Sequence, residues 1–246
     1  MALETGIRIA LTTALRATAL SLAVAFSGAS GLVAVAEPVA KKAAAEKPVA
    51  ALTGDAADIV AWVIATGDNR GLPFAVVDKK AAQVLVFDAK GKLKAQTPAL
   101  LGSAVGDYSA EGVADRELRD IPAEDRTTPA GRFVAGYGPA AGGERALWVD
   151  YATAISIHAL PKNAPKQEKR KTRLSSKTVD DNRITHGCIN VSSTFYSKTI
   201  KPIFGKKGGV FYVLPDTITV QEAFPAFEAE QRLATLGVTT TASLGR

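Results

Sequence analysis

Two short apolar stretches separated by a polar turn stand out in the central part of the chain. Residues 74–77 and 83–87 are rich in β-branched and aromatic side chains, and residues 78–80 between them are typical of a hairpin connection. A second turn at 88–91 begins with Asp and ends with Gly, as type I turns prefer, and 92–101 then predicts a third strand. Short strands joined by tight turns predict a mainly β domain.

Strand-like and helical patterns continue on both sides of this hairpin. Two strands are predicted within 146–158 and one at 210–214, whereas 103–128 is polar and irregular and predicts a long loop. Helical spacing of apolar residues predicts a short helix capped by Thr53 and a closing helix over 220–236. The apolar positions are Ile59, Val60, Trp62 and Val63 in the first helix, and Ala223, Phe224, Phe227 and Leu233 in the second.

The N-terminal part of the chain has the layout of a targeting segment. Arg8 and Arg16 precede a run of small and apolar residues, and residues 34–36 form an A-x-A cleavage pattern. We therefore predict a secretory signal peptide over 1–36, followed by a linker of Ala, Lys, Pro and Glu over 37–52. The alternative is a permanent anchor, although the run is only weakly apolar. Cleavage would leave an exported, periplasmic or cell-envelope protein without a stable membrane span.

Composition narrows the classes of function. The 246 residues carry 30 Lys and Arg against 24 Asp and Glu, a net charge of +6, which is only modestly basic. Aromatic residues make up 7% of the chain, and no nucleic-acid-binding motif is present, so we expect no nucleic-acid partner. The single cysteine, Cys188, excludes a disulfide framework within the chain. Exported proteins normally pair their cysteines, so Cys188 is buried and inert, shared with another chain, or reactive.

Both histidines of the chain lie near this cysteine. The first, His158, ends an apolar stretch in which Ile155 and Ile157 alternate with Ser156. In a strand the two isoleucines would face the core, while Ser156 and His158 would face the other way. A histidine at the polar side of a strand end is well placed to act in a cleft, although such a residue can also be an ordinary surface histidine.

The second histidine belongs to the sequence Thr-His-Gly-Cys-Ile-Asn at 185–190. In extended chain His186, Cys188 and Asn190 share one face, and Gly187 permits unusual backbone angles beside the thiol. A helix that begins just after this sequence, capped at Ser192–Thr194, would lower the pKa of the thiol.

These residue types are the ones that acyl transfer requires. Cys188 would supply the nucleophile, a histidine the base, and backbone N–H groups of 186–188 the oxyanion donors. The group that orients the imidazole is left open among four candidates. They are Ser156, Thr185, Asn190 and a backbone carbonyl.

The hexapeptide at 185–190 with His158 upstream resembles the signature of the L,D-transpeptidases, the family with a YkuD-type catalytic domain. The resemblance extends over roughly residues 70–216. It includes the 77–93 hairpin, the Thr-Pro-Ala-Gly-Arg-Phe turn at 128–133 and the strand at 210–215. It implies a single mainly β, sandwich- or barrel-like catalytic domain with a few short helices over 53–218. Residues 219–246 would then form a C-terminal helix and tail.

The resemblance also implies an activity without a cofactor or metal. Family members act on peptidoglycan stem peptides, which serve as both donor and acceptor. The matching cysteine, Cys188, would attack the bond between the diamino acid and D-Ala, with His158 as general base. His186 and Gly187 would line the oxyanion site, and Thr185 and Asn190 would hold the loop. Some relatives instead cleave this bond, exchange a D-amino acid or attach a lipoprotein.

One stretch departs from the family pattern. The spacer between His158 and Thr185 is longer than usual, and 162–183 looks like an insertion. It contains five Lys, three Arg and three acidic residues, a net charge of +5. A solvated loop and a lid that attracts anionic wall polymer are both consistent with this composition. The insertion also leaves His186 as an alternative base, although a base on a separate strand approaches the thiol more freely.

Other kinds of protein fit these residues less well. Sortase-like enzymes usually carry Thr-Leu-x-Thr-Cys, whereas Thr-His-Gly precedes Cys188 here. NlpC/P60-type and papain-type enzymes place Cys before His, the reverse of this order. A zinc site formed by His158, His186 and Cys188 has an unusual spacing. A non-catalytic wall-binding protein would have no need for the complete set of Cys, His and Gly.

Overall fold

The computed structural model describes residues 52, 54–140 and 145–237. The predicted signal peptide over 1–36 lies outside these residues, as does the predicted linker apart from Leu52. The predicted cap at Thr53 lies outside them too. In the part of the chain that the structure describes, no helix is both long and apolar enough to cross a membrane.

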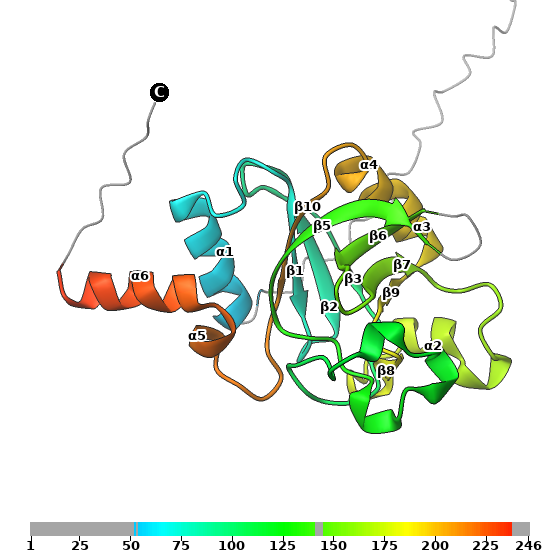
Figure 1. The fold of residues 1–246 in the computed structure, drawn as a ribbon. Helices are drawn as coiled ribbons and strands as arrows, with labels where there is room; N and C mark the ends of the chain where they lie inside the picture. Colours follow the sequence, from blue (N-terminus) through cyan, green and yellow to red (C-terminus); the bar gives the residue numbers. More distant parts are fainter. Residues whose placement is uncertain (1–51, 53, 141–144, 238–246) are drawn as a thin grey trace, which may run out of the picture. The chain divides into compact units, whose positions relative to one another are not determined.

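An eight-stranded sheet forms the body of the domain (Figure 1), in the order β3-β2-β1-β10-β5-β6-β7-β9. A separate two-stranded sheet pairs β4 with β8. The strands are β1 Phe74–Asp78, β2 Gln83–Phe87, β3 Leu93–Pro98, β4 Leu101–Gly102, β5 Gly131–Pro139, β6 Arg145–Asp150, β7 Ile155–Ala159, β8 Arg183–Thr185, β9 Ile189–Val191 and β10 Gly209–Val213. The predictions of a mainly β fold and of the 78–80 hairpin are confirmed.

Short helices flank the sheet. They are α1 Gly54–Thr66, α2 Arg170–Ser175, α3 Ser193–Phe195, α4 Lys201–Phe204, α5 Val220–Ala223 and α6 Pro225–Thr235, with a π-helical turn over Tyr196–Ile200. The prediction of one closing helix over 220–236 is wrong, because the chain breaks at Phe224. Phe224 precedes a proline and takes φ −131° and ψ 78°, and a residue before proline is disfavoured in helical geometry.

Two hydrophobic cores lie against opposite faces of β1, β2 and β10. In β1, Phe74 and Val76 belong to one core, and Ala75 and Val77 belong to the other. Burial on both faces explains why these strands have continuous apolar runs rather than alternating ones. Helix α1 contributes the predicted residues Ile59, Val60, Trp62 and Val63 to the first core, which Phe227 of α6 joins. Figure 1 shows α1, α5 and α6 grouped beside the sheet.

The 103–128 segment is more ordered than the predicted loop. It contains three 3₁₀ turns, at Val113–Asp115, Leu118–Asp120 and Ala123–Asp125. A buried ion pair at its start joins it to the β1–β2 turn, because Lys79 Nζ lies 2.9 Å from Asp107 Oδ1. Neither side chain is exposed to solvent.

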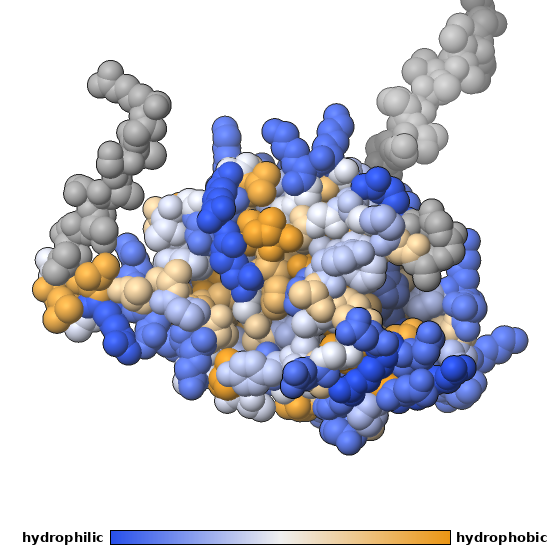
Figure 2. Space-filling model, viewed as in Figure 1, coloured by the Kyte–Doolittle hydropathy of each residue, from blue (hydrophilic) through white to orange (hydrophobic). Residues whose placement is uncertain are grey.

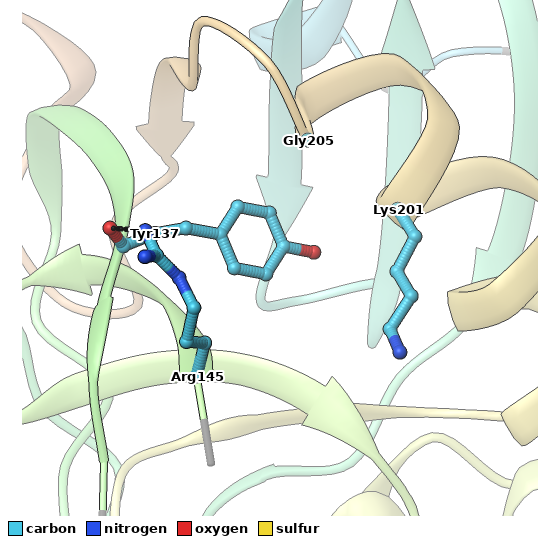
Figure 3. Close-up of a pocket in the computed structure, with 4 residues that line it drawn as sticks. All are labelled: Tyr137, Arg145, Lys201 and Gly205. Carbon is cyan, nitrogen blue, oxygen red and sulfur yellow. Dashed lines mark hydrogen bonds between the residues drawn. The ribbon is translucent and has the colours of Figure 1, made fainter. Parts of the chain in front are cut away.

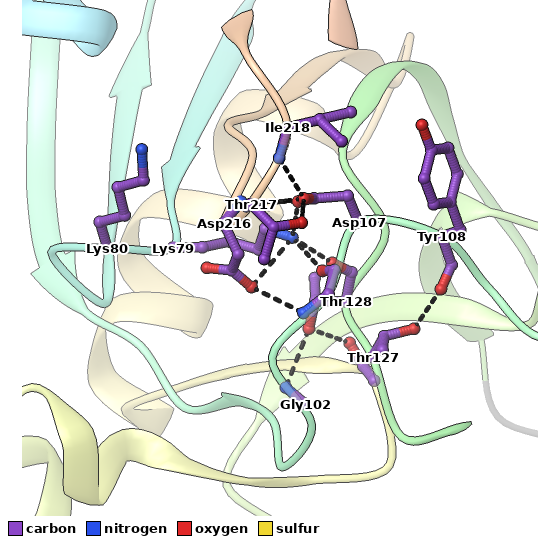
Figure 4. A network of polar contacts seen from close by, with 12 residues as sticks. Lys79, Lys80, Gly102, Asp107, Tyr108, Thr127, Thr128, Asp216, Thr217 and Ile218 are labelled. Atoms are coloured by element: carbon purple, nitrogen blue, oxygen red, sulfur yellow. Dashed lines mark hydrogen bonds and ion pairs between the residues drawn. The ribbon is translucent and has the colours of Figure 1, made fainter. Parts of the chain in front are cut away.

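Figure 4 shows the network around this pair. Lys79 Nζ also donates to the carbonyls of Gly106 (2.6 Å) and Thr128 (2.8 Å), and it lies 3.2 Å from Asp216 Oδ2. Burial raises the pKa of Asp107, but hydrogen bonds from Thr217 and Lys79 outweigh it and hold the pKa well below its usual range. The Asp107 carboxylate is therefore charged, and each buried charge of the pair has a partner.

Removing the lysine should leave the buried Asp107 carboxylate without its cation, whereas Asp216 keeps its ion pair with Arg183. We expect Lys79→Met to lower the free energy of unfolding by about 3–5 kcal/mol, as measured by urea denaturation. Lys80→Met is the matched control, since Lys80 is 56% exposed and only 3.7 Å from an exposed Asp55. The control should change the free energy by less than about 0.5 kcal/mol. Equal effects of the two substitutions would contradict a structural role for the buried pair.

Candidate active site

Parallel pairing of β7 with β9 brings the candidate residues together. His158 on β7 is the register partner of Asn190 on β9, and Cys188 immediately precedes β9. The alternation predicted for β7 is confirmed, because Ile155 and Ile157 belong to the hydrophobic core. Ser156 instead lies with its Oγ 3.6 Å from the sulfur of Cys188.

The Cys188 thiol and the His158 imidazole are electrostatically coupled. Burial raises the pKa of Cys188, but a hydrogen bond and charge interaction with His158, together with hydrogen bonds to Ser156, bring the pKa below its ordinary value. Burial lowers the pKa of His158, and the same interaction with Cys188 outweighs burial and raises it. The two shifts have one cause, and both favour the thiolate–imidazolium form of the pair.

Neither a helix dipole nor His186 is needed to explain this shift. Ser192 caps α3 as predicted, with its Oγ 3.1 Å from the Phe195 nitrogen, but the helix begins beyond β9 and is only three residues long before the π-helical turn. The pKa of His186 is lowered by burial and then by the charges of Arg126 and Arg170, so its imidazole is neutral at pH 7. Of the two histidines, His158 is the one that perturbs the thiol.

The turn that carries Cys188 is held by two threonines. Thr185 Oγ1 donates to the Cys188 carbonyl (2.7 Å) and accepts from the Gly187 nitrogen (3.1 Å). Thr128 Oγ1 donates to the Gly187 carbonyl (2.7 Å). Because the Gly187 N–H is already bonded to Thr185, oxyanion donors are to be sought among the other groups of the turn.

Glycine is required at 187 by both backbone angle and space. Gly187 has φ +123°, which L side chains rarely adopt. A Cβ there would lie 2.6 Å from the Thr127 carbonyl oxygen and 2.8 Å from the side chain of Ile155. The turn can therefore pack against Thr127 only without a side chain at this position.

The wall of the pocket beside the thiol comes from an unexpected segment. Cys188 and His186 line a narrow cavity of about 60 Å³ together with residues of the 103–128 segment. Val113, Leu118 and Ile121 supply apolar surface there. Sequence reasoning missed these residues, because an irregular polar stretch shows no pattern that indicates where it folds back.

A larger pocket lies elsewhere on the domain (Figure 3). It has a volume of about 560 Å³ and is lined by Tyr137, Arg145, Lys201 and Gly205. Arg145 already donates to the Tyr137 carbonyl at 2.8 Å. This lining contains neither a cysteine nor a histidine, so the smaller pocket at Cys188 is the candidate active site.

The insertion at 162–183 is folded rather than a fully solvated loop. It contains α2 and 3₁₀ turns at Lys166–Glu168 and Asp180–Asn182. Its five lysines are exposed, whereas its three arginines are half-buried. Figure 2 shows hydrophilic residues gathered over the region of α2. The alternative that it forms a lid over the cleft is not supported by the pocket at Cys188, whose lining comes from other segments.

The chemical groups gathered at Cys188 are a thiol, an imidazole and a backbone turn. Within the described ranges, no three His, Cys, Asp or Glu side chains are grouped so as to hold a metal ion. His158, His186 and Cys188 thus form no such set. What the site offers is a thiol with a lowered pKa, an imidazole electrostatically coupled to it, and a tightly held turn.

Comparison with known proteins identifies the family. The family model for the L,D-transpeptidase catalytic domain, YkuD, matches residues 73–200, which is more than half of the chain. The chain therefore belongs to the YkuD L,D-transpeptidase family, as its sequence resemblance predicted. No curated protein matches it at the significance required.

Solved structures of similar fold have low sequence identity. The helical cell shape determining protein Pgp2 from Campylobacter jejuni has a TM-score of 0.39 and 16% identity, over 62% of this chain and 52% of that chain. An L,D-transpeptidase from Mycobacterium smegmatis has a TM-score of 0.33 and 16% identity, over 57% of this chain and 58% of that chain. The catalytic domain of the Enterococcus faecium L,D-transpeptidase has a TM-score of 0.34 and 18% identity. The match covers 57% of this chain and 95% of that chain. The chain thus spans about half the length of Pgp2.

A side chain at 187 should disrupt the turn. We expect Gly187→Ala to lower the free energy of unfolding by about 1–3 kcal/mol, because it combines backbone strain with a clash at Thr127. Thermal and urea denaturation would measure this. Gly136→Ala is the control, since a Cβ at Gly136 meets nothing within 4 Å. A Gly187→Ala protein as stable as this control would contradict the observed turn geometry.

The coupling of the two side chains predicts a pH dependence of thiol reactivity. Alkylation of Cys188 by iodoacetamide should reach half its maximal rate below the ordinary pKa of a cysteine, because the thiolate is the reactive form. His158→Gln should move this midpoint to higher pH. Burial raises the pKa of Cys188, and the variant lacks the imidazole that lowers it. Rates at each pH can be followed by mass spectrometry.

His186→Gln serves as the comparison. Its midpoint should stay close to that of the wild type, because His186 is absent from the main causes of the Cys188 shift. If the pH midpoint of alkylation moved further in His186→Gln than in His158→Gln, His186 rather than His158 would be the histidine that lowers the pKa of Cys188.

Proposed function

We propose that this protein is an exported peptidoglycan L,D-transpeptidase. The observation that carries the proposal is the Cys188–His158 pair, placed beside the Thr185–Asn190 turn in a YkuD domain. On this proposal 1–36 is the signal peptide, 37–52 a linker, 53–218 the catalytic domain and 219–246 a C-terminal helical segment and tail. The site of action is then the periplasm or cell envelope.

The first half-reaction makes a thioester. His158 accepts the thiol proton, and the Cys188 thiolate attacks the carbonyl that joins the diamino acid at stem position three to D-Ala. The C–N bond to D-Ala breaks, and His158 returns its proton to the leaving amine. On this proposal His186 and Gly187 line the oxyanion site, and N–H groups of the turn other than that of Gly187 stabilise the oxyanion. Thr185 keeps this turn in place through its bonds to Gly187 and Cys188.

The second half-reaction transfers the acyl group. An amine of a second stem peptide attacks the thioester and loses a proton to His158. The C–S bond then breaks, and the sulfur recovers a proton as Cys188 is released. The product is a 3→3 cross-link, and no oxidant, reductant or cofactor is consumed. Water as acceptor would give a carboxypeptidase, and a lipoprotein amine would give an anchoring enzyme.

The proposal is tested by following both products at once. The protein and its Cys188→Ala variant are incubated with disaccharide-tetrapeptide, and free D-Ala and muropeptide dimer are measured by mass spectrometry. We expect both products from the wild type and neither from the variant, because the thiol carries the acyl group. The variant also controls for contaminating enzymes.

Other outcomes discriminate the alternatives. Release of D-Ala without dimer would replace transpeptidation by the carboxypeptidase or lipoprotein-anchoring reaction. Identical product levels from both proteins would refute the enzymatic proposal and leave a non-catalytic wall-binding protein.

A further inference from the structure

One side chain of the insertion at 162–183 contacts a residue of the candidate site. Arg170, the first residue of α2, donates from Nη1 to Asn190 Oδ1 at 2.5 Å. Its Nε donates to Glu168 Oε2, also at 2.5 Å. The Arg170 side chain is only 12% exposed. This is a charge-assisted hydrogen bond in a shielded place, where such bonds are strongest.

This bond determines which way the Asn190 amide faces. An amide has one oxygen that accepts and one nitrogen that donates, whereas a guanidinium only donates. The oxygen of Asn190 must therefore face Arg170, and its Nδ2 faces His158 Nε2 at 3.1 Å. Asn190 is 1% exposed. Arg170 therefore adds a charged partner that holds the amide in this orientation.

The orientation of the amide matches the tautomer that the Ala159 carbonyl sets at His158. The Ala159 carbonyl can only accept, so the Nδ1 that lies 2.7 Å from it carries the hydrogen. Nε2 faces a donor and is the unprotonated nitrogen. Among the charged groups that act on His158, Cys188 raises its pKa and Arg170 lowers it, while Glu168 is paired with Arg170. The charge of Arg170 and its hold on Asn190 therefore oppose the effect of Cys188 on the ring.

The segment that contains Arg170 is held in place by hydrogen bonds within the insertion and to the rest of the domain. Arg173 donates to the carbonyls of Glu168 (2.7 Å) and Asp181 (2.5 Å). Asn182 donates to the Ala99 carbonyl at 2.9 Å, next to β4. These contacts tie the insertion to itself and to the domain, so the guanidinium has a defined position relative to Asn190.

We propose that Arg170 is a positioning residue of the catalytic pair, which holds Asn190 so that its amide nitrogen donates to His158 Nε2 and keeps the imidazole in one orientation and one tautomer. The inference rests on the proposed function for its account of turnover, and on the described contacts alone for the tautomer. It gives the unusual insertion a part in the site, through one arginine and without contact to the reacting atoms.

The first test measures His158 itself. The chain has two histidines, so their ring C2–H signals can be followed by NMR and assigned with His186→Gln. The titration uses the full chain with Cys188→Ser, which removes the thiol from the titration. Adding Arg170→Gln should raise the pKa of His158, because a positive charge is lost and the freed amide can turn its oxygen to the imidazolium.

Lys171→Gln is the matched control, since it removes the same charge from the next residue of α2, where the side chain is exposed. It should leave the pKa of His158 unchanged. Arg170→Lys keeps the charge but not the planar fork, and should give an intermediate value. An unchanged His158 pKa in both Arg170 variants would overturn the proposal. This readout needs no substrate, so it is independent of the proposed reaction.

The second test asks whether Arg170 acts through Asn190. With active Cys188 enzyme, Arg170→Gln should lower kcat by about 10-fold with little change in KM, as expected when a base is misoriented. In a double-mutant cycle with Asn190→Ala, the two effects should be far from additive. Additive effects, or a rise in KM with kcat unchanged, would make Arg170 an independent substrate contact and refute the positioning role.

Discussion

The parallel pairing of β7 with β9 is the interaction on which the candidate site depends. Its backbone register places His158 opposite Asn190, and with it the Cys188 turn, although these residues are 30 or more positions apart in the chain. Because side chains alternate along a strand, a slip of one residue would turn His158 away from the thiol. The Leu160 nitrogen continues the pairing to the Val191 carbonyl at 3.0 Å, so the register is defined beyond the strands themselves.

Parallel strands cannot be joined by a tight turn, and this explains the place of the insertion. A parallel pair needs a crossover connection, and residues 162–183 form much of the crossover from β7 toward β9. A longer spacer leaves His158 in place because both ends of the crossover are tied to the sheet. What the extra length adds is a half-buried arginine beside the site, with the lysines of the same segment in solvent.

The buried Lys79 network also stabilises the site, by contacts that do not involve the β7–β9 pairing. Lys79 holds the Thr128 carbonyl, and the hydroxyl of the same threonine holds the Gly187 carbonyl. The first β-hairpin is thus connected to the turn that carries Cys188 through only one intervening residue, Thr128. Since the same lysine also binds Asp107, it secures the segment that lines the pocket. The stability of the core and the shape of the site therefore depend on shared contacts.

The sequence by itself determined the family, the mainly β fold, the first hairpin, helix α1 and the association of Cys188 with a histidine. These follow from local patterns, such as apolar alternation and a specific hexapeptide. Only the tertiary structure decided that His158 is the partner of the thiol, that 103–128 forms the pocket wall, and that Arg170 reaches Asn190. Each of these depends on contacts between residues distant in the chain, and such contacts leave no periodic trace in a single sequence.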